Sequence, residues 1–130
     1  MARAYGGTRV PAHRSQEAIE KLLGKHGVDT FRWTSTAGHI GLEFRRPSGH
    51  GPLGFHMALD YEEERLKAQY LRALYWYVKS QLEAVEFGLV SFERAFMPAL
   101  ITGPNRTLGD DVAQQIKEGS LGVPQLESGE

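Results

Sequence analysis

Cysteine is absent from the 130 residues of this chain. Disulfides, zinc sites with thiolate ligands and thiol nucleophiles are therefore excluded, and the absence fits a reducing compartment. No apolar run approaches the roughly 20 residues of a membrane span, and the first residues lack the apolar core of a signal peptide. We therefore expect a cytoplasmic protein without a membrane partner.

Catalytic signatures are also missing. Gly49-x-Gly51-x-x-Gly54 matches the dinucleotide-binding pattern in its letters, but Pro52 lies inside it and a strand pattern follows where a helix should begin. We interpret this segment as a glycine-rich hairpin loop. The five histidines have none of the spacings of a metal site. The sequence thus favours a non-enzymatic protein that holds neither a cofactor nor a metal.

Charge is distributed unevenly along an otherwise ordinary globular composition, which is 41% apolar and predicts one domain. Residues 1–50 carry eight Lys and Arg against four Asp and Glu, although the whole chain has a net charge of −1. Arg3, Arg9 and Arg14 all precede the first acid, Glu17. A basic arm of this kind is typical of nucleic-acid-binding proteins, and it is also common in proteins that bind none.

Residues 60–87 predict one long amphipathic helix around which the rest of the chain is organised. Asp60 suits the N-cap, and Glu63 three residues later completes a carboxylate capping box. About 28 residues give a length of roughly 40 Å, more than the core of such a domain spans, so part of the helix should protrude or meet a second copy. Its apolar stripe follows spacings of three and four residues and comprises Leu66, Tyr70, Leu74, Tyr77, Val78, Leu82, Val85 and Leu89.

The opposite side of this helix carries Arg72, Trp76 and Lys79. Cations beside an aromatic ring suit phosphate neutralisation combined with base stacking. A solvated helix face with a tryptophan packed on a neighbouring element explains the same pattern. The rings of Tyr75-Trp76-Tyr77 point in three directions, which is more than one sheet covers, so we expect a homo-oligomer.

Two segments, 29–46 and 51–60, alternate in polarity and are rich in β-branched and aromatic residues. They predict a three-stranded antiparallel meander with its first turn at Ala37-Gly38. The apolar positions at period two in the second and third strands are Ile40, Leu42, Phe44, Leu53, Phe55, Met57 and Leu59.

Cations and rings are interleaved on this meander at Arg32, Trp33, His39, Phe44, Arg45 and Arg46. Such interleaving is a reasonable platform for single-stranded nucleic acid. Against this interpretation, the small core needs the neighbouring phenylalanines, and alternation lets only one of Arg45 and Arg46 share a face with His39.

Short helices flank these elements, so the predicted fold class is α+β, with the sheet packed on the long helix. We expect a flexible basic arm over residues 1–14, a single α+β domain over 15–119 and an acidic flexible tail over 120–130. The caps and ends of the short helices are expected at Ser15 with Gly24 or Gly27, at Ser91, and at Thr107 with Asp110 and Gly119.

Two stretches carry a resemblance, AIEKLLGKHGVDTFRW and LRALYWYVKSQLEAVEFGLVSFERAFMPALI with the following GPNRTLGDD. They resemble a family of small bacteriophage and prophage proteins without a settled activity, over most of residues 15–126. The resemblance implies phage origin, and hence the host cytoplasm; members of that family tend to have a longer stretch between sheet and long helix. In topology alone, the chain is similar to Rad52- and RecT-type single-strand annealing proteins, which assemble as rings or filaments on DNA.

Our leading hypothesis is a phage protein that binds nucleic acid, single-stranded DNA above all, in replication or recombination. The alternative is a protein-interaction module that binds and modulates a host protein through the long helix and the acidic C-terminal half. In the leading hypothesis Trp33 stacks on a base. The arginines that neutralise phosphates are Arg3, Arg9, Arg14, Arg32, Arg45 and Arg46. Along the long helix, the binding surface continues over Arg72, Trp76 and Lys79.

Overall fold

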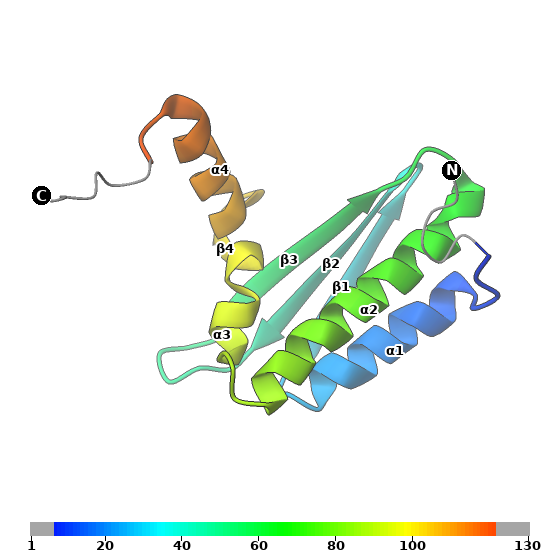
Figure 1. Ribbon diagram of the computed structural model, residues 1–130, viewed down its shortest axis with the longest axis horizontal. Helices are drawn as coiled ribbons and strands as arrows, with labels where there is room; N and C mark the ends of the chain where they lie inside the picture. The colour runs from blue at the N-terminus through cyan, green and yellow to red at the C-terminus, as the bar shows by residue number, and fades with distance from the viewer. Residues whose placement is uncertain (1–6, 122–130) are drawn as a thin grey trace, which may run out of the picture.

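The computed structural model describes residues 7–121 and confirms the α+β class. Three antiparallel strands, β1 (Thr30–Thr36), β2 (His39–Arg46) and β3 (Leu53–Asp60), form a sheet in the order β1-β2-β3. Two helices, α1 (Ala12–Gly24) and α2 (Lys67–Glu86), lie side by side on one face of that sheet (Figure 1). They run in the same direction, so that His26, just after the end of α1, meets Glu86, the last residue of α2, at 3.1 Å.

The remaining elements gather at the end of the sheet where α2 finishes (Figure 1). Among them α4 stands away from the sheet and from α2, which sets it apart from the other long helices. In chain order these elements are α3 (Phe92–Ala95), η2 (Met97–Ala99), β4 (Ile101–Gly103), β5 (Arg106–Thr107) and α4 (Leu108–Glu118). A short 3₁₀ turn, η1 (Glu64–Leu66), lies at the opposite end of α2 and directly precedes it.

The two hairpin loops of the meander agree with the sequence pattern. Thr36 pairs with His39, so Ala37 and Gly38 are the two turn residues, and the positive φ of 77° at the second position is one that glycine adopts without strain. Gly49 and Gly51 lie in the loop 47–52 that closes the second hairpin, as their interpretation as loop residues predicted, whereas Gly54 lies in β3 and pairs with Arg45. A phosphate-binding strand-to-helix turn is therefore not formed there.

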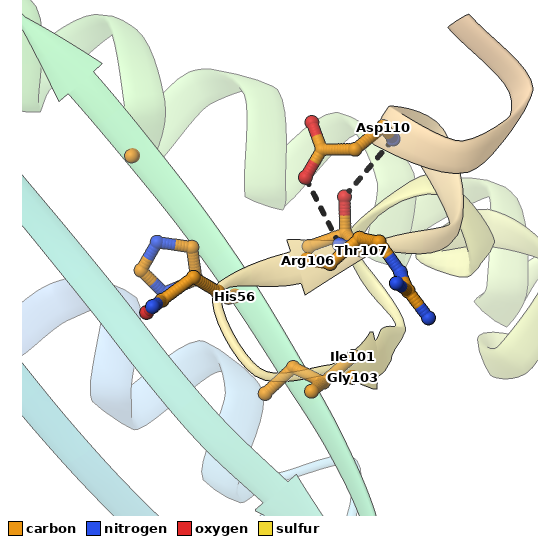
Figure 2. A pocket seen from close by; sticks show the side chains of 8 residues that line it. His56, Ile101, Gly103, Arg106, Thr107 and Asp110 are labelled. Atoms are coloured by element: carbon orange, nitrogen blue, oxygen red, sulfur yellow. Dashed lines mark hydrogen bonds between the residues drawn. The ribbon is translucent and has the colours of Figure 1, made fainter. Parts of the chain in front are cut away.

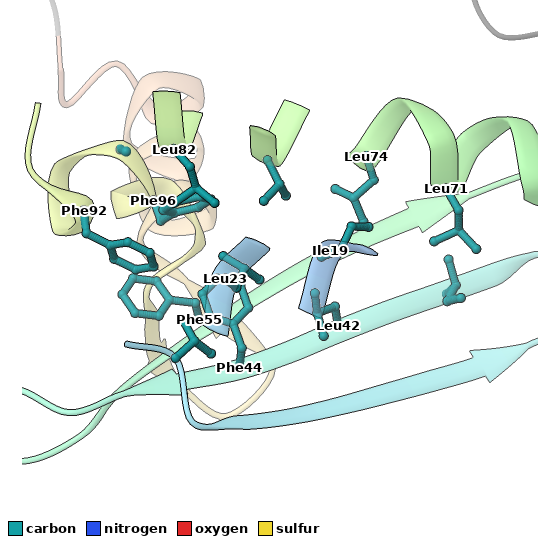
Figure 3. Packing of buried hydrophobic residues seen from close by; sticks show 14 of the residues in the cluster. Ile19, Leu23, Leu42, Phe44, Phe55, Leu71, Leu74, Leu82, Phe92 and Phe96 are labelled. Carbon is teal, nitrogen blue, oxygen red and sulfur yellow. The ribbon is translucent and has the colours of Figure 1, made fainter. Parts of the chain in front are cut away.

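One face of the sheet and the two helices enclose the hydrophobic core (Figure 3). Phe44 lies at its centre, where it stacks on Phe55 with ring centroids 5.1 Å apart and meets the edge of Phe96 at 5.9 Å. This aromatic contact joins the sheet to α3, which lies about 50 residues further along the chain. The helices contribute Ile19, Leu23, Leu71, Leu74, Val78 and Leu82, all of which are buried.

The long helix is shorter than the pattern predicted. Asp60 is the last residue of β3, where it pairs with His39, so the expected N-cap at Asp60 is wrong. Glu63 forms no capping box, and its carboxylate instead binds Arg65 at 2.8 Å. All eight residues of β2 pair with β3, and the last pair joins His39 to Asp60. The backbone hydrogen bonds of this pairing keep Asp60 in the strand, so the helix begins later in the chain. The 20 residues of α2 then span roughly 30 Å, and the excess length disappears.

The first helix begins earlier than expected. Pro11 occupies the N-cap position and Ala12 opens α1, so the prediction of Ser15 as the cap is wrong. Ser15 instead faces the core and is fully buried. Residues 12–14, expected within the basic arm, therefore belong to the helix. Proline suits this entry because its ring fixes φ near the value the chain needs there.

The C-terminal elements follow their predicted caps. The Ser91 side chain accepts a hydrogen bond from the Arg94 amide, and Thr107 and Asp110 form the reciprocal capping box of α4. Gly119 ends α4 with a left-handed φ of 78°. Between these caps, β4 and β5 form a short hairpin in which Ile101 pairs with Thr107 and Gly103 with Arg106. Within residues 7–121 no helix is long and apolar enough to cross a membrane.

We expect Leu42→Ala to lower the free energy of unfolding by about 2–5 kcal/mol, because Leu42 is fully buried. Leu89→Ala is the matched control: Leu89 is 79% exposed, and exposed substitutions change stability by less than about 0.5 kcal/mol. Urea unfolding monitored by circular dichroism measures both. Equal losses in the two variants would contradict the assignment of the covered sheet face.

Candidate phosphate-binding site and nucleic-acid interface

The face of the sheet away from the helices is polar and carries no Phe, Tyr or Trp. Two of its arginines share one acid, because Arg32 binds Glu43 at 2.8 Å and Arg45 approaches the same carboxylate at 4.0 Å. His39 is held by Asp60 at 2.7 Å. By register this face comprises Thr30, Arg32, Thr34, Thr36, His39, Gly41, Glu43, Arg45, Gly54, His56, Ala58 and Asp60. It therefore offers paired charges but no stacking platform.

Trp33 and Arg46 lie apart from Arg32 and Arg45, on the covered side of the sheet. The Trp33 indole N–H donates to Glu20 Oε2 on α1 at 2.7 Å. The Arg46 guanidinium donates to the His26 carbonyl at 2.8 Å, pairs with Glu93 and lies over the Phe92 ring. Both side chains thus tie the sheet to its neighbours, and the structure does not bring the four predicted residues onto one face.

Three arginines from separate parts of the chain instead line one cavity, which we call the arginine cavity. Arg9 precedes α1, Arg14 lies in the first turn of α1, and Arg72 lies in the second turn of α2. Val10 and Pro11 complete the lining of this cavity, whose volume is about 510 Å³. The parallel course of the two helices causes the convergence, because it places both helix starts at the same end of the layer.

The arginine cavity carries positive charge without a compensating acid. None of its three arginines forms an ion pair within the described residues, and no acid lines the cavity. Arg72 lies 4.3 Å from the centre of the Tyr75 ring. Its Nε atom is buried and has no hydrogen-bond acceptor among residues 7–121, which is uncommon for a buried N–H.

The start of α1 adds to the positive electrostatic potential of the arginine cavity. Its first turn contains no acid and its N-cap, Pro11, supplies no side-chain oxygen, so the free backbone amides and the positive end of the helix dipole remain available. Guanidinium groups bind phosphate through paired N–H donors. The arrangement therefore matches a phosphate in both charge and hydrogen-bond type.

A basic strip continues from the arginine cavity along α2. Trp76 follows Arg72 by one helical turn and is 42% exposed, and the Lys79 ammonium lies 5.0 Å from its ring centre. The predicted grouping of Arg72, Trp76 and Lys79 is therefore present on the surface. Arg3 lies outside the described residues.

A second cavity, of about 470 Å³, separates β3 from the β4-β5 hairpin. Figure 2 shows His56 on one side of this cavity and Thr107 and Asp110, joined by two hydrogen bonds, on the other. Arg106 also lines it but binds Asp111 at 2.8 Å. Its polar groups are thus largely engaged in capping α4. The described residues contain no group of three or more His, Asp or Glu that could hold a metal ion.

Sequence reasoning found each residue of the arginine cavity but not their convergence. The three arginines are separated by up to 63 positions in the chain (72 minus 9), and no local spacing relates them. Comparisons of the chain with models of protein families, with curated proteins and with solved structures find no match. The function is therefore inferred from the residues themselves.

The capping box of α4 gives a pH-dependent prediction. Hydrogen bonds from Thr107, the backbone amide first, lower the pKa of the Asp110 carboxyl. The ionised form is thus favoured in the folded helix. Its contribution to the stability of α4 is complete above the ordinary pKa of Asp and is lost as pH falls through the lowered pKa.

We expect a carboxyl-carbon NMR titration of Asp110 to give a pKa below that of an unfolded peptide. Amide-exchange protection at the start of α4 should fall over the same pH range. Asp110→Asn is the control, because it should remove this pH response of α4. A pH response that persists unchanged in Asp110→Asn would contradict the role of the carboxylate.

Proposed function

We propose that the protein binds nucleic acid through backbone phosphates, prefers single strands to duplex, and acts without catalysis in phage replication or recombination. The observation that carries this proposal is the arginine cavity, where Arg9, Arg14 and Arg72 converge without an acid. Three like charges in one place repel one another, and a phosphate relieves that repulsion while accepting their hydrogen bonds.

The strip along α2 supports nucleic acid over a free phosphate. Arg72 belongs both to the cavity and to the strip, and Lys79 lies about 10 Å further along the helix axis at 1.5 Å per residue. Trp76 between them exposes an aromatic surface. Phosphates bound along this line would place a base over the indole, and only an unpaired base has a free face for stacking.

The proposal differs from the initial hypothesis in the surface that it uses. The helical layer carries the binding, through the arginine cavity and the strip on α2. Arg32 and Arg45 already share Glu43 on the open sheet face, so they contribute only long-range attraction. Trp33 and Arg46 have structural partners and take no part. Phage origin rests on the resemblance of residues 15–126 to the phage family.

Salt dependence tests the phosphate contacts. We expect fluorescence anisotropy with a labelled oligonucleotide to give a binding constant that falls steeply with salt, because each neutralised phosphate releases counterions. Arg14→Gln and Arg72→Gln should each reduce the slope of log K against log salt by about 0.7 to 1.

The matched control is Arg65→Gln, because Arg65 is exposed and already paired with Glu63, and its slope should equal that of the parent. A thermal melt of each variant verifies folding. Absence of binding even at low salt would overturn the proposal and favour the alternative of a host-protein ligand.

Intrinsic fluorescence tests the stacking surface, because the chain contains only two tryptophans. We expect single-stranded DNA to quench the tryptophan fluorescence of Trp33→Phe, which retains Trp76. The fluorescence of Trp76→Phe, which retains Trp33, should remain nearly unchanged. Trp33 is held by Glu20 on the covered side of the sheet, so a base should not reach it. Quenching confined to Trp33 would place the interface on the sheet instead.

A further inference from the structure

Helix α4 folds without burying any of its residues. It has 11 residues and none of them is buried, whereas isolated helices shorter than about 12–15 residues are marginal in water. Its charged residues occupy one side, with Asp110, Asp111, Lys117 and Glu118 within about a third of the helix circumference at 100° per residue. The opposite side is apolar and is exposed beyond the first turn, and we call it the apolar edge of α4.

The apolar edge is aliphatic and broad. Leu108, Val112 and Ile116 follow one another at intervals of four residues, with Ala113 beside them. Val112 is 37% exposed and Ile116 is 62% exposed. An aliphatic edge of this kind normally packs against a neighbouring element. Its first turn packs on η2, but no other element within residues 7–121 covers Val112 and Ile116.

The same chain contains an apolar groove of matching character, which we call the β3 groove. It has a volume of about 450 Å³ and lies between the outer edge of β3 and the near side of α2. It is lined by His56, Met57, Ala58, Leu59, Ala73, Leu74, Tyr77, Phe96, Pro98 and Ala99. No Asp, Glu, Lys or Arg lines the groove, just as none interrupts the apolar edge of α4.

The α4 of a chain does not enter its own β3 groove, because its direction is set at its first turn. No linker precedes it, since β5 ends at Thr107 and α4 begins at Leu108. A Cβ added at Gly109 would lie 2.8 Å from the Pro98 carbonyl oxygen, so this turn is packed tightly against η2. The rest of the helix then runs away from the sheet (Figure 1).

We infer that the protein forms a twofold dimer in which α4 of each copy lies in the β3 groove of the other. A second copy is the occupant because one chain carries both complementary surfaces and cannot join them itself. A twofold axis makes each copy donor and acceptor at once, so the contact closes without leaving either surface free. The helix–groove contact then occurs twice, so the dimer buries each of the two apolar surfaces in both copies.

Light scattering coupled to size-exclusion chromatography tests this dimer. The full chain should give a mass close to twice the 14.5 kDa of one chain. Ile116→Glu places a charge on the apolar edge and Ala73→Lys places one in the β3 groove. Each should raise the dimer dissociation constant by at least about a hundredfold, because the charge is desolvated at both symmetric contacts. Lys117→Glu, on the polar side of α4, should leave the dimer intact.

A charge swap distinguishes the reciprocal contact from other ways of pairing two copies. An equimolar mixture of Ile116→Glu and Ala73→Lys should dimerise again, since the altered helix then meets the altered groove and the other contact is unaltered. The double variant should likewise recover the dimer. Circular dichroism verifies that each variant is folded.

Several outcomes would overturn the inference. A strict monomer at all concentrations would do so, as would a dimer indifferent to Ile116→Glu. Loss of the dimer in Ile116→Glu with none in Ala73→Lys would remove the groove from the interface. Failure of the mixture to dimerise would exclude the reciprocal arrangement. None of these outcomes depends on nucleic-acid binding, because Arg14 and Arg72 lie outside both surfaces.

Discussion

The packing of two parallel helices on a single face of the sheet is the constraint on which the other features depend. Three strands bury only one apolar face, and Phe44, stacked on Phe55 and touching Phe96, joins that face to the C-terminal elements. Because α1 and α2 cover this face from the same starting end, Arg14 and Arg72 come together at one end of the layer. The arginine cavity is thus a consequence of how the core is covered.

The same constraint leaves the other sheet face polar. Alternation assigns every ring of the three strands to the covered side, so a residue such as Trp33 is used in packing and in a hydrogen bond to Glu20. The cations on the open side are paired with Glu43. A small domain with few aromatic residues cannot use them both for its core and for a stacking surface on the sheet. The proposed stacking residue, Trp76, is partly exposed because it lies on the side of α2 away from the core.

The C-terminal part of the chain depends on a different balance. The capping box of Thr107 and Asp110 and the left-handed Gly119 define α4 through local interactions, yet local interactions alone support so short a helix poorly. The close approach of Gly109 to Pro98 directs the helix outward. The exposure of Val112 and Ile116 on a helix that is well defined at both ends is the observation from which we infer a second chain.

The sequence by itself determined the α+β class, the meander with its Ala37-Gly38 turn, the loop character of Gly49 and Gly51, and the caps at Ser91 and Thr107. These features depend on alternation and on backbone hydrogen bonds within a few residues. Tertiary structure decided where α2 begins, because pairing with β2 extended β3 to Asp60, and it decided that Trp33 and Arg46 serve packing. It alone brought Arg9, Arg14 and Arg72 together, since residues so far apart in sequence converge only through the packing of α1 beside α2.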